Sequence, residues 1–394
     1  MAQVAGLAAG VLADMAFGDP QRFHPVAGFG QAASKLERRL YAPTRTAGGR
    51  FALIAVGVPV AGALGVSALT ARRPLLRAAA TAAATWSVLG GTSLRREAAA
   101  MAADLSGAFP GAADRARAGE RARAEDRAGA NGGAGANGGA GPDDGARPED
   151  RAHAEDRAGA DRGAGAEDRA RGEGLPRAED LDSTDGLAAA RRRLPNLVGR
   201  DPSALDGPEI ARATVESVAE NTSDAQVAPL FWGAVAGLPG LVGYRAINTL
   251  DAMVGHMSPR YRDFGTASAR LDDVANLIPS RLTALLIAAT AGSAGGDGRA
   301  ALEAWRRDGD RHPSPNSGQC EAAMAGALGV RLGGRNIYHG RVEERPQLGS
   351  GPRPSAADVA RAARISGAVG IAALVVCGAA RLALGLRSRP GRRT

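Results

Sequence analysis

Val215-Glu-Ser-Val-Ala-Glu-Asn-Thr-Ser-Asp224 opens the stretch of sequence that decides the fold of this chain. An apolar run follows it, then Tyr244-Arg-Ala-Ile-Asn-Thr-Leu-Asp251 and Arg270-Leu-Asp-Asp-Val-Ala-Asn276. The rest of the chain is mostly Ala, Gly, Leu and Arg, whereas this stretch sets acidic, amide and basic side chains into patterns that predict helices. Polar groups inside apolar helices are costly unless they are paired, and within a membrane they indicate a functional site. The stretch therefore predicts the functional core of a helical protein.

The polar residues of this stretch fall on shared helix faces. Glu216 and Glu220 are spaced for one face and Asn221 with Asp224 for the adjacent face. The same spacing groups further residues on the later helices, namely Arg245, Asn248 and Asp251, and then Asp272, Asp273 and Asn276. Grouped carboxylates suit Mg²⁺, which takes oxygen ligands and is often shared with substrate phosphates, so Asp224, Asp272 and Asp273 are candidate magnesium ligands. The alternative is an Asn, Asp and Arg hydrogen-bond network that only holds buried helices together.

Apolar runs outside and inside this stretch predict a membrane protein. A bilayer is spanned by roughly 20 apolar helical residues. The candidate runs are Val4–Phe17, Phe51–Thr70, Leu75–Gly91, Ala225–Gly243, Leu277–Gly296 and Ile365–Leu386. We therefore expect a mainly α fold, a polytopic α-helical membrane protein with four to six apolar spans.

The composition of the chain limits the kinds of molecule that it is expected to bind. The 394-residue chain carries a formal net charge of +8, almost all of its basic residues are arginine, and only 4% of its residues are aromatic. A basic balance fits an anionic substrate or anionic lipid. Nucleic acid is not expected, because aromatic platforms and recognisable nucleic-acid motifs are missing. The two cysteines give neither a disulfide framework nor a cysteine-based metal spacing.

A low-complexity insert divides the chain. Residues 107–185 repeat Ala-Glu-Asp-Arg and Gly-Ala-Asn-Gly with almost no large apolar residue, so we expect a disordered segment that carries no chemistry. The expected organisation is residues 1–106 with N-terminal membrane helices and the His24 loop, the insert 107–185, a motif-bearing catalytic region 186–364, and a C-terminal membrane helix with a basic tail at 365–394.

A second chemical element is His312-Pro-Ser-Pro-Asn-Ser-Gly318. Its prolines stiffen a loop, and Asn316 and Ser317 supply the turn and N-cap chemistry for a helix that we expect from about Gln319. The free backbone N–H groups of such a helix form an anion site, to which Ser314 can add a donor. The alternative is an ordinary helix cap. The chain has no P-loop motif, so any use of ATP must be of another kind.

Several motifs together resemble the adenosylcobinamide-phosphate synthase family of cobalamin biosynthesis. They are Gly18-Asp-Pro-x-x-x-His-Pro-Val26, Val198-Gly-Arg-Asp201, Glu216-Ser-Val-Ala-Glu-Asn-Thr-Ser-Asp224, Tyr244-Arg-Ala-Ile-Asn-Thr-Leu-Asp-x-Met253, Arg260-Tyr-x-x-Phe-Gly265 and His312-Pro-Ser-Pro-Asn-Ser-Gly318. The resemblance covers nearly the whole chain apart from the insert, and the order of the motifs makes it specific.

The resemblance implies an ATP-dependent acid–amine ligase of the membrane. Such an enzyme joins aminopropanol, or its phosphate, to a propionate of adenosylcobyric acid, with Mg²⁺ as an inferred cofactor. Activation of a carboxylate as an acyl phosphate needs Mg²⁺ and donors around phosphoryl oxygens, and the amine needs a base. The candidate catalytic residues are Glu216, Glu220, Asp224 and His312. The candidate substrate or ATP contacts are His24, Asn221, Arg245, Asn248, Asp251, Tyr261, Arg262, Ser314, Asn316 and Ser317.

Two other classes of protein fit the polar helices. One is a membrane transporter with an intramembrane ion path, and the other is a non-enzymatic scaffold. A transporter is expected to show internal repeats and broken helices at mid-bilayer, and the sequence shows no convincing repeat.

The topology contains a conflict. If every apolar run crosses the membrane, residues 244–276 lie on the opposite side from His24, Glu216 and His312. Proline interrupts Ala225–Gly243 and Leu277–Gly296, so we expect both to be re-entrant or packed within protein. All motifs then share one face, expected to be cytoplasmic because ATP is there. The turn at Arg72 and Arg73 and the basic tail then lie outside, against the positive-inside tendency.

Overall fold

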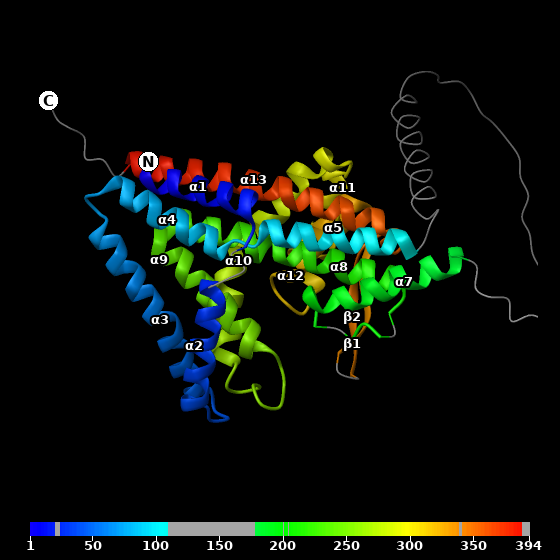
Figure 1. Cartoon of the computed structure of the whole chain (residues 1–394), viewed down its shortest axis with the longest axis horizontal. Helices are drawn as coiled ribbons and strands as arrows, with labels where there is room; N and C mark the ends of the chain where they lie inside the picture. Colours follow the sequence, from blue (N-terminus) through cyan, green and yellow to red (C-terminus); the bar gives the residue numbers. More distant parts are fainter. Residues whose placement is uncertain (20–23, 109–177, 200, 204, 339–340, 388–394) are drawn as a thin grey trace, which may run out of the picture.

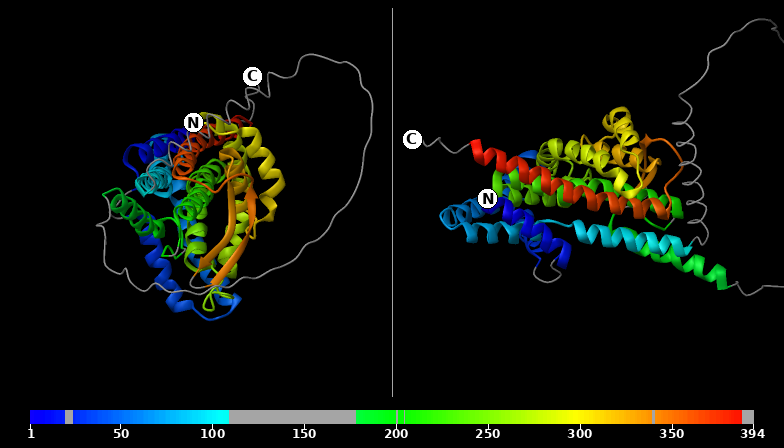
Figure 2. Two further views of the ribbon diagram at one scale, coloured as in Figure 1. Left: turned by 90° about the vertical axis from the view of Figure 1, so that its right-hand side faces the viewer. Right: turned by 90° about the horizontal axis from the view of Figure 1, so that it is seen from above.

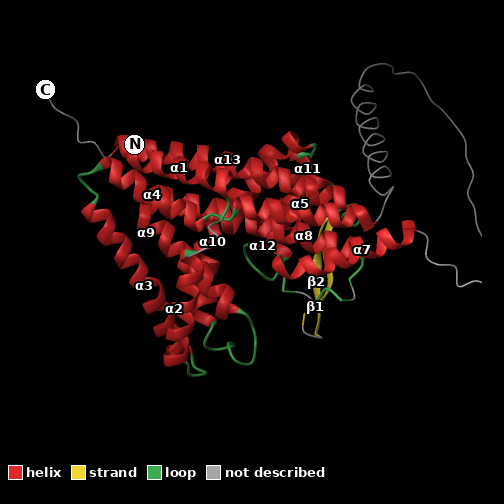
Figure 3. Ribbon diagram, in the orientation of Figure 1, coloured by secondary structure: helices red, strands yellow, loops and turns green. Residues whose placement is uncertain are grey.

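The computed structural model describes residues 1–19, 24–108, 178–199, 201–203, 205–338 and 341–387. Helices dominate these residues (Figures 1 and 3). The helices are α1 (Ala2–Phe17), α2 (Pro25–Leu40), α3 (Arg45–Leu69), α4 (Pro74–Val88), α5 (Gly91–Ala108), α7 (Ala178–Arg193), α8 (Gly207–Thr222), α9 (Ala228–Leu250), α10 (Thr266–Thr290), α11 (Gly298–Asp308), α12 (Ser317–Leu328) and α13 (Ala356–Arg387). The strands β1 (Arg331–Tyr338) and β2 (Arg341–Gly349) pair as an antiparallel hairpin.

The predicted fold class is confirmed: the chain is a mainly α polytopic membrane protein. Among the described residues, four helical segments are long and apolar enough to cross a membrane, namely Arg45–Leu69, Gly207–Gly255, Thr266–Ala294 and Ala356–Leu384. Two of them, Arg45–Leu69 and Ala356–Leu384, agree with spans that the sequence favoured, and the other two do not. The helices α1 and α4 have 16 and 15 residues, short of the usual spanning length. Helix α10, which we expected to be re-entrant or packed within protein, continues through Pro279 and reaches that length.

The apolar run at Ala225–Gly243 reverses the direction of the chain. Inside α9, Gly237 adopts φ 69° and ψ −145°, a conformation open almost only to glycine, and it separates two helical segments. The two segments lie close together, since a side chain at Gly240 would collide with the carbonyl of Trp232. After this reversal Asn248 donates a hydrogen bond to Asp224, 24 residues earlier in the chain. The reversal thereby brings Asp251 and Glu216 to one cavity.

Helix α12 lies at the centre of the protein, and every one of its residues is buried. Its small side chains allow neighbours to approach closely: a side chain at Gly318 would collide with the carbonyl of Gly309, and one at Gly326 with the carbonyl of Ala300. Helices α8, α10 and α11 and the hairpin pack around α12 (Figures 1 and 2). One continuous apolar core contains residues from early, middle and late parts of the chain, among them Leu7, Met101 and Met324.

A smaller apolar cluster forms a second lobe beside α2, below the main bundle in Figure 1. The rings of Phe51 and Tyr41 pack on Phe264, each with its centroid 5.2 Å from that of Phe264. Glu37 accepts hydrogen bonds from Arg260 and from the Tyr261 hydroxyl, each at 3.0 Å. The loop that contains the Arg260–Gly265 motif is therefore held by α2 and α3.

The element boundaries differ from the sequence division at several points. Helix α5 extends to Ala108 and α7 begins at Ala178, so both ends of the predicted insert 107–185 are helical. The central part of the insert, residues 109–177, lies outside the described residues. Helix α13 begins at Ala356 and crosses the predicted boundary at residue 365, because Asp358 and Ser355 form its first turn.

The reversal at Gly237 predicts a specific sensitivity. Substituting Gly237→Ala places a side chain in a glycine conformation and 2.6 Å from the Gln3 amide nitrogen, at a cost of roughly 1–3 kcal/mol. We expect a lower apparent melting temperature in detergent. Gly57→Ala is the matched control, because Gly57 lies in the apolar helix α3 with open space around it. Equal melting temperatures for the two variants would contradict this account of the reversal.

Candidate active site

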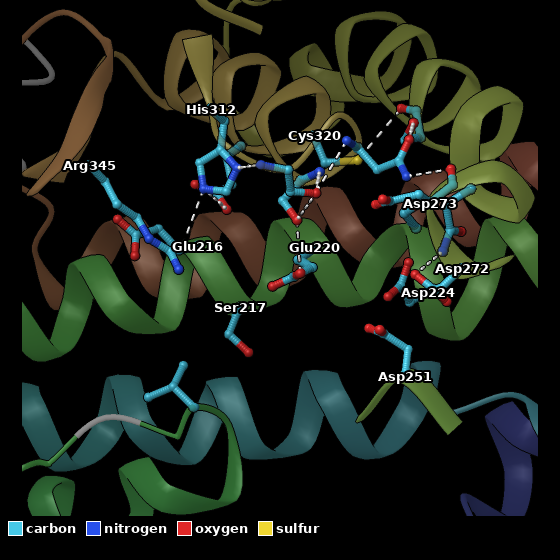
Figure 4. Close-up of a pocket in the computed structure, with 18 of the residues that line it drawn as sticks. Glu216, Ser217, Glu220, Asp224, Asp251, Asp272, Asp273, His312, Cys320 and Arg345 are labelled. Atoms are coloured by element: carbon cyan, nitrogen blue, oxygen red, sulfur yellow. Dashed lines mark hydrogen bonds and ion pairs between the residues drawn. The ribbon is translucent and has the colours of Figure 1, made fainter. Parts of the chain in front are cut away.

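The motif residues converge on one cavity of about 420 Å³ between α8, α10, α12 and the hairpin. Figure 4 shows Asp224, Asp251 and Asp272 at one end of the cavity and His312 and Arg345 at the other. The predicted site residues that line it are Glu216, Glu220, Asp224, Asp251, Asp272, Asp273, His312, Ser314, Asn316 and Ser317. A volume in this range suits a small-molecule site.

The acidic end is built by two π-helical turns and the start of α10. Asp224 lies in the turn η2 (Ser223–Val227) and Asp251 in the turn η3 (Asp251–Gly255). The Asn248 amide donates to Asp224 at 3.1 Å and to Asp272 at 3.4 Å, so that one side chain holds two carboxylates from different helices. Single π-helical turns within α-helices are rare and occur frequently at functional sites.

Further hydrogen bonds, beside those from Asn248, orient the Asp272 carboxylate. Asn276 donates to Asp272 at 3.0 Å and accepts from the Tyr244 hydroxyl at 3.0 Å. Arg245 donates weakly to Asn248 at 3.4 Å. Thus Arg245 and Asn248, predicted as substrate contacts, lie behind the carboxylates and position them.

The His312–Gly318 loop joins the two ends of the cavity. Ser314 caps α12, because its hydroxyl accepts from the backbone N–H groups of Asn316 and Ser317 at 3.3 and 3.2 Å. Both ends of the Asn316 amide are used: it donates to the Asp273 carbonyl at 2.8 Å and accepts from Ser280 at 3.2 Å. The loop therefore locks α12 to α10. Asn316 also lines the cavity, and its contact with a phosphate stays a prediction.

His312 is buried, with both ring nitrogens facing N–H donors. Its Nδ1 accepts from the Ser314 backbone at 3.0 Å, and its Nε2 lies 3.2 Å from a guanidinium nitrogen of Arg345. A neutral imidazole has one acceptor nitrogen, and an imidazolium has none. Burial and the Arg345 charge therefore lower the pKa of His312 below its ordinary value of 6.5, so the ring is neutral at neutral pH.

Glu216 anchors the hairpin to α8. Its carboxylate accepts from Arg212 at 3.0 Å and from the Gly333 backbone N–H at 2.8 Å. This contact brings β2 and Arg345 to the cavity beside His312. Glu216 therefore holds the hairpin against α8. Glu220 accepts a hydrogen bond from the Ser317 hydroxyl at 2.9 Å.

The donor set fits Mg²⁺ only as a shared ion. Among the described residues, no three His, Cys, Asp or Glu side chains are placed to hold a metal ion by themselves. Asp224 and Asp272 are hard oxygen ligands held side by side by Asn248. This arrangement suits a magnesium ion that takes one or two carboxylates and completes its shell with phosphate oxygens and water.

Four further predicted site residues do not line the cavity. His24 caps α2, since its Nδ1 accepts from the Val26 backbone at 3.2 Å. The Tyr261 hydroxyl donates to Glu37, and Arg262 is exposed on the same loop. Asn221 also does not line the cavity, because its amide bonds back to Ser217 on its own helix. The sequence motifs contain residues that line the cavity as well as residues that hold helices and loops in place. The direction of each side chain in the structure distinguishes the two groups.

The structure adds site residues that spacing did not single out. Arg345 arrives on a hairpin more than a hundred residues from the acidic helix, and no local signal connects the two. Glu321 lies one helical turn into α12 with its carboxylate 3.9 Å from His312 Nε2. Ser280 and Cys320 line the floor, where the thiol lies 3.5 Å from the Ser280 carbonyl. Burial raises the pKa of the Cys320 thiol, so it stays protonated.

Fold and site together define a polytopic helical membrane protein with an acidic, histidine-containing cavity. The family described as CobD/Cbib protein matches residues 7–119 and 171–366, and the chain belongs to this family.

Curated relatives agree with this membership. The chain is 42% identical over 387 residues to the cobalamin biosynthesis protein CobD of Mycobacterium tuberculosis (strain CDC 1551 / Oshkosh), covering 98% of this chain and 96% of that protein. It is 57% identical over 177 residues to the protein of the same name from Rhodobacter capsulatus, covering 44% of this chain and 55% of that protein. No solved structure matches. The membership supports a role in cobalamin biosynthesis.

The lowered pKa of His312 predicts how stability depends on pH. Below about 6.5 the unfolded chain takes up a proton at this position more readily than the folded chain, so acidification destabilises the fold, by about 1.4 kcal/mol for each unit by which the pKa is lowered. The melting temperature of His312→Gln should fall less on acidification than that of the wild type. His256→Gln, at an exposed histidine, is the control. A wild-type pH response in His312→Gln would show that His312 is not held neutral.

Proposed function

We propose that this protein is an adenosylcobinamide-phosphate synthase, an ATP-dependent ligase that joins aminopropanol or aminopropanol phosphate to a propionate of adenosylcobyric acid. The observation that carries the proposal is the division of one cavity into a carboxylate-rich end and an end with a neutral buried histidine. The two ends suit the two halves of such a reaction.

The first half of the reaction activates the propionate. Its carboxylate oxygen attacks the terminal phosphorus of ATP, which gives an acyl phosphate and ADP. The carboxylates of Asp224, Asp272 and Asp273 would repel ATP on their own. When bound, Mg²⁺ would neutralise phosphoryl charge between these carboxylates and the nucleotide. Asn248 keeps Asp224 and Asp272 in place for this contact.

The second half of the reaction forms the amide. The amine nitrogen attacks the acyl carbon, inorganic phosphate leaves, and the amine loses a proton. His312 is a candidate base for that proton because its ring is neutral, and to accept it one ring nitrogen must exchange its N–H contact, with Ser314 or with Arg345, for the amine. The nearby Glu321 carboxylate, 3.9 Å from Nε2, would stabilise the resulting imidazolium. The negative lining of the cavity also attracts the protonated amine before it reacts.

The size of the cavity limits what enters it. A volume of about 420 Å³ accommodates a propionate, a small amine and part of a nucleotide. The corrin macrocycle is larger and would rest outside, with only its side chain inserted. The use of ATP implies that the cavity faces the cytoplasm of a multi-pass cell-membrane protein.

Removing one carboxylate should abolish turnover without loss of the protein. For Asp224→Asn we expect kcat to fall about 100-fold or more, because charge at the phosphoryl group is no longer balanced. The assay is ATP-dependent amide formation by purified protein with adenosylcobyric acid and aminopropanol phosphate. Asp263→Asn is the matched control, since Asp263 is an exposed residue outside the cavity. Wild-type turnover in Asp224→Asn would remove this residue from the site.

Replacing Asp272 should raise the Mg²⁺ concentration that turnover requires. Turnover should stop on chelation and return with added Mg²⁺. In Asp272→Asn the Mg²⁺ concentration for half-maximal turnover should rise about 10- to 100-fold, while Asp263→Asn leaves it unchanged. An unchanged Mg²⁺ response in Asp272→Asn would place the metal elsewhere.

A further inference from the structure

A second cavity, of about 210 Å³, lies between α1, α3, α4, α13 and the reversal in α9. It shares no lining residue with the candidate active site. The start of α1, the end of α13 and the α3–α4 turn lie together at this end of the molecule, as Figures 1 and 2 both show.

Two arginines line this cavity. Arg77 comes from α4 and Arg381 from the apolar helix α13, and both are half-buried. Among the described residues, neither guanidinium has an acidic partner or any other hydrogen-bond acceptor. Two half-buried cations beside apolar surface are costly unless an anion pairs with them. The cavity therefore has the charge of an anion site.

The reversal in α9 adds a second source of positive potential. The helical segment after Gly237 starts at Leu238 and Pro239, which line the cavity. The first backbone N–H groups of a helix lack partners within that helix and carry partial positive charge, so they favour anions.

Gln3 supplies an observation independent of charge. Its side chain is 6% exposed and lines the same cavity. Its amide nitrogen donates to the Gly233 carbonyl at 2.7 Å, while its carbonyl oxygen has no partner among the described residues. A buried acceptor without a donor suits a ligand that carries a hydroxyl group as well as a phosphate.

The cavity opens among exposed apolar side chains. Leu64 of α3 and Val235 of α9 line it and are exposed, and Leu76, which precedes Arg77 in α4, is also exposed. Beyond them the turn carries Arg72 and Arg73, both exposed. Apolar side chains next to arginines are typical of the boundary between acyl chains and lipid headgroups.

We propose that this cavity binds the headgroup of an anionic phospholipid. Arg77, Arg381 and the start of the second α9 segment hold the phosphodiester, and Gln3 accepts from a headgroup hydroxyl, as in phosphatidylglycerol. The exposed apolar side chains face the acyl chains. The proposal is independent of the ligase activity, because the two cavities are separate.

Lipid binding by the full-length protein tests the proposal. The purified protein is titrated with phosphatidylglycerol or phosphatidylcholine, and bound lipid is counted by native mass spectrometry. We expect retention of phosphatidylglycerol in preference to phosphatidylcholine. The double variant Arg77→Gln and Arg381→Gln should bind phosphatidylglycerol about tenfold or more weakly, because two charged contacts are lost. The control is Arg72→Gln with Arg73→Gln, which removes the same charge from the exposed turn and should keep wild-type binding.

A second measurement does not depend on the variants folding. Phosphatidylglycerol should raise the melting temperature of the wild type, and phosphatidylcholine should not. Equal effects of the two lipids, or equal loss of binding in the two double variants, would overturn the proposal. Displacement of the lipid by soluble glycerol phosphate at comparable concentration would also overturn it, since the ligand would then be a free phosphate.

Discussion

The hydrogen bonds from Asn248 to Asp224 and Asp272 are the interactions on which the site depends. They exist because α9 reverses at Gly237 and brings its end back beside its beginning. A straight helix of that length would separate Asn248 from Asp224 by roughly 36 Å. One glycine conformation thus determines whether the motifs form a cavity or lie at opposite ends of a membrane helix.

Three carboxylates of the acidic cavity accept hydrogen bonds, each from a separate element. Glu216 is tied to the hairpin, Glu220 to the start of α12, and Asp272 to Asn276 on its own helix. These partners spread the negative charge over the cavity and leave Asp251, on a π-helical turn, as a lining residue. Mutual repulsion keeps such a set open to cations, which agrees with a site that receives a metal-bound nucleotide and an amine.

The two cavities have opposite electrostatic character. Carboxylates gather around the candidate active site, and arginines gather around the turn at Arg72 and the cavity of Arg77 and Arg381. An active site on the cytoplasmic side would leave arginines on the outer side, against the usual charge bias. A lipid phosphate between Arg77 and Arg381 would offset one of these positive charges.

The sequence by itself determined the helical membrane class, the polar helix faces and the family. Spacing was sufficient to group Glu216 with Glu220 and Asp272 with Asn276, because helix periodicity is a local property. The motifs could not separate His24, Tyr261 and Arg262 from the site, because their side chains bond within α2 and the second lobe. Only the tertiary structure decided that Arg345 meets His312 and that Asn316 locks two helices together, since these contacts join segments 33 and 43 residues apart in the chain. Such contacts depend on the packing around α12 and on the contact that holds the hairpin to Glu216, which follow from the whole fold and not from any local pattern.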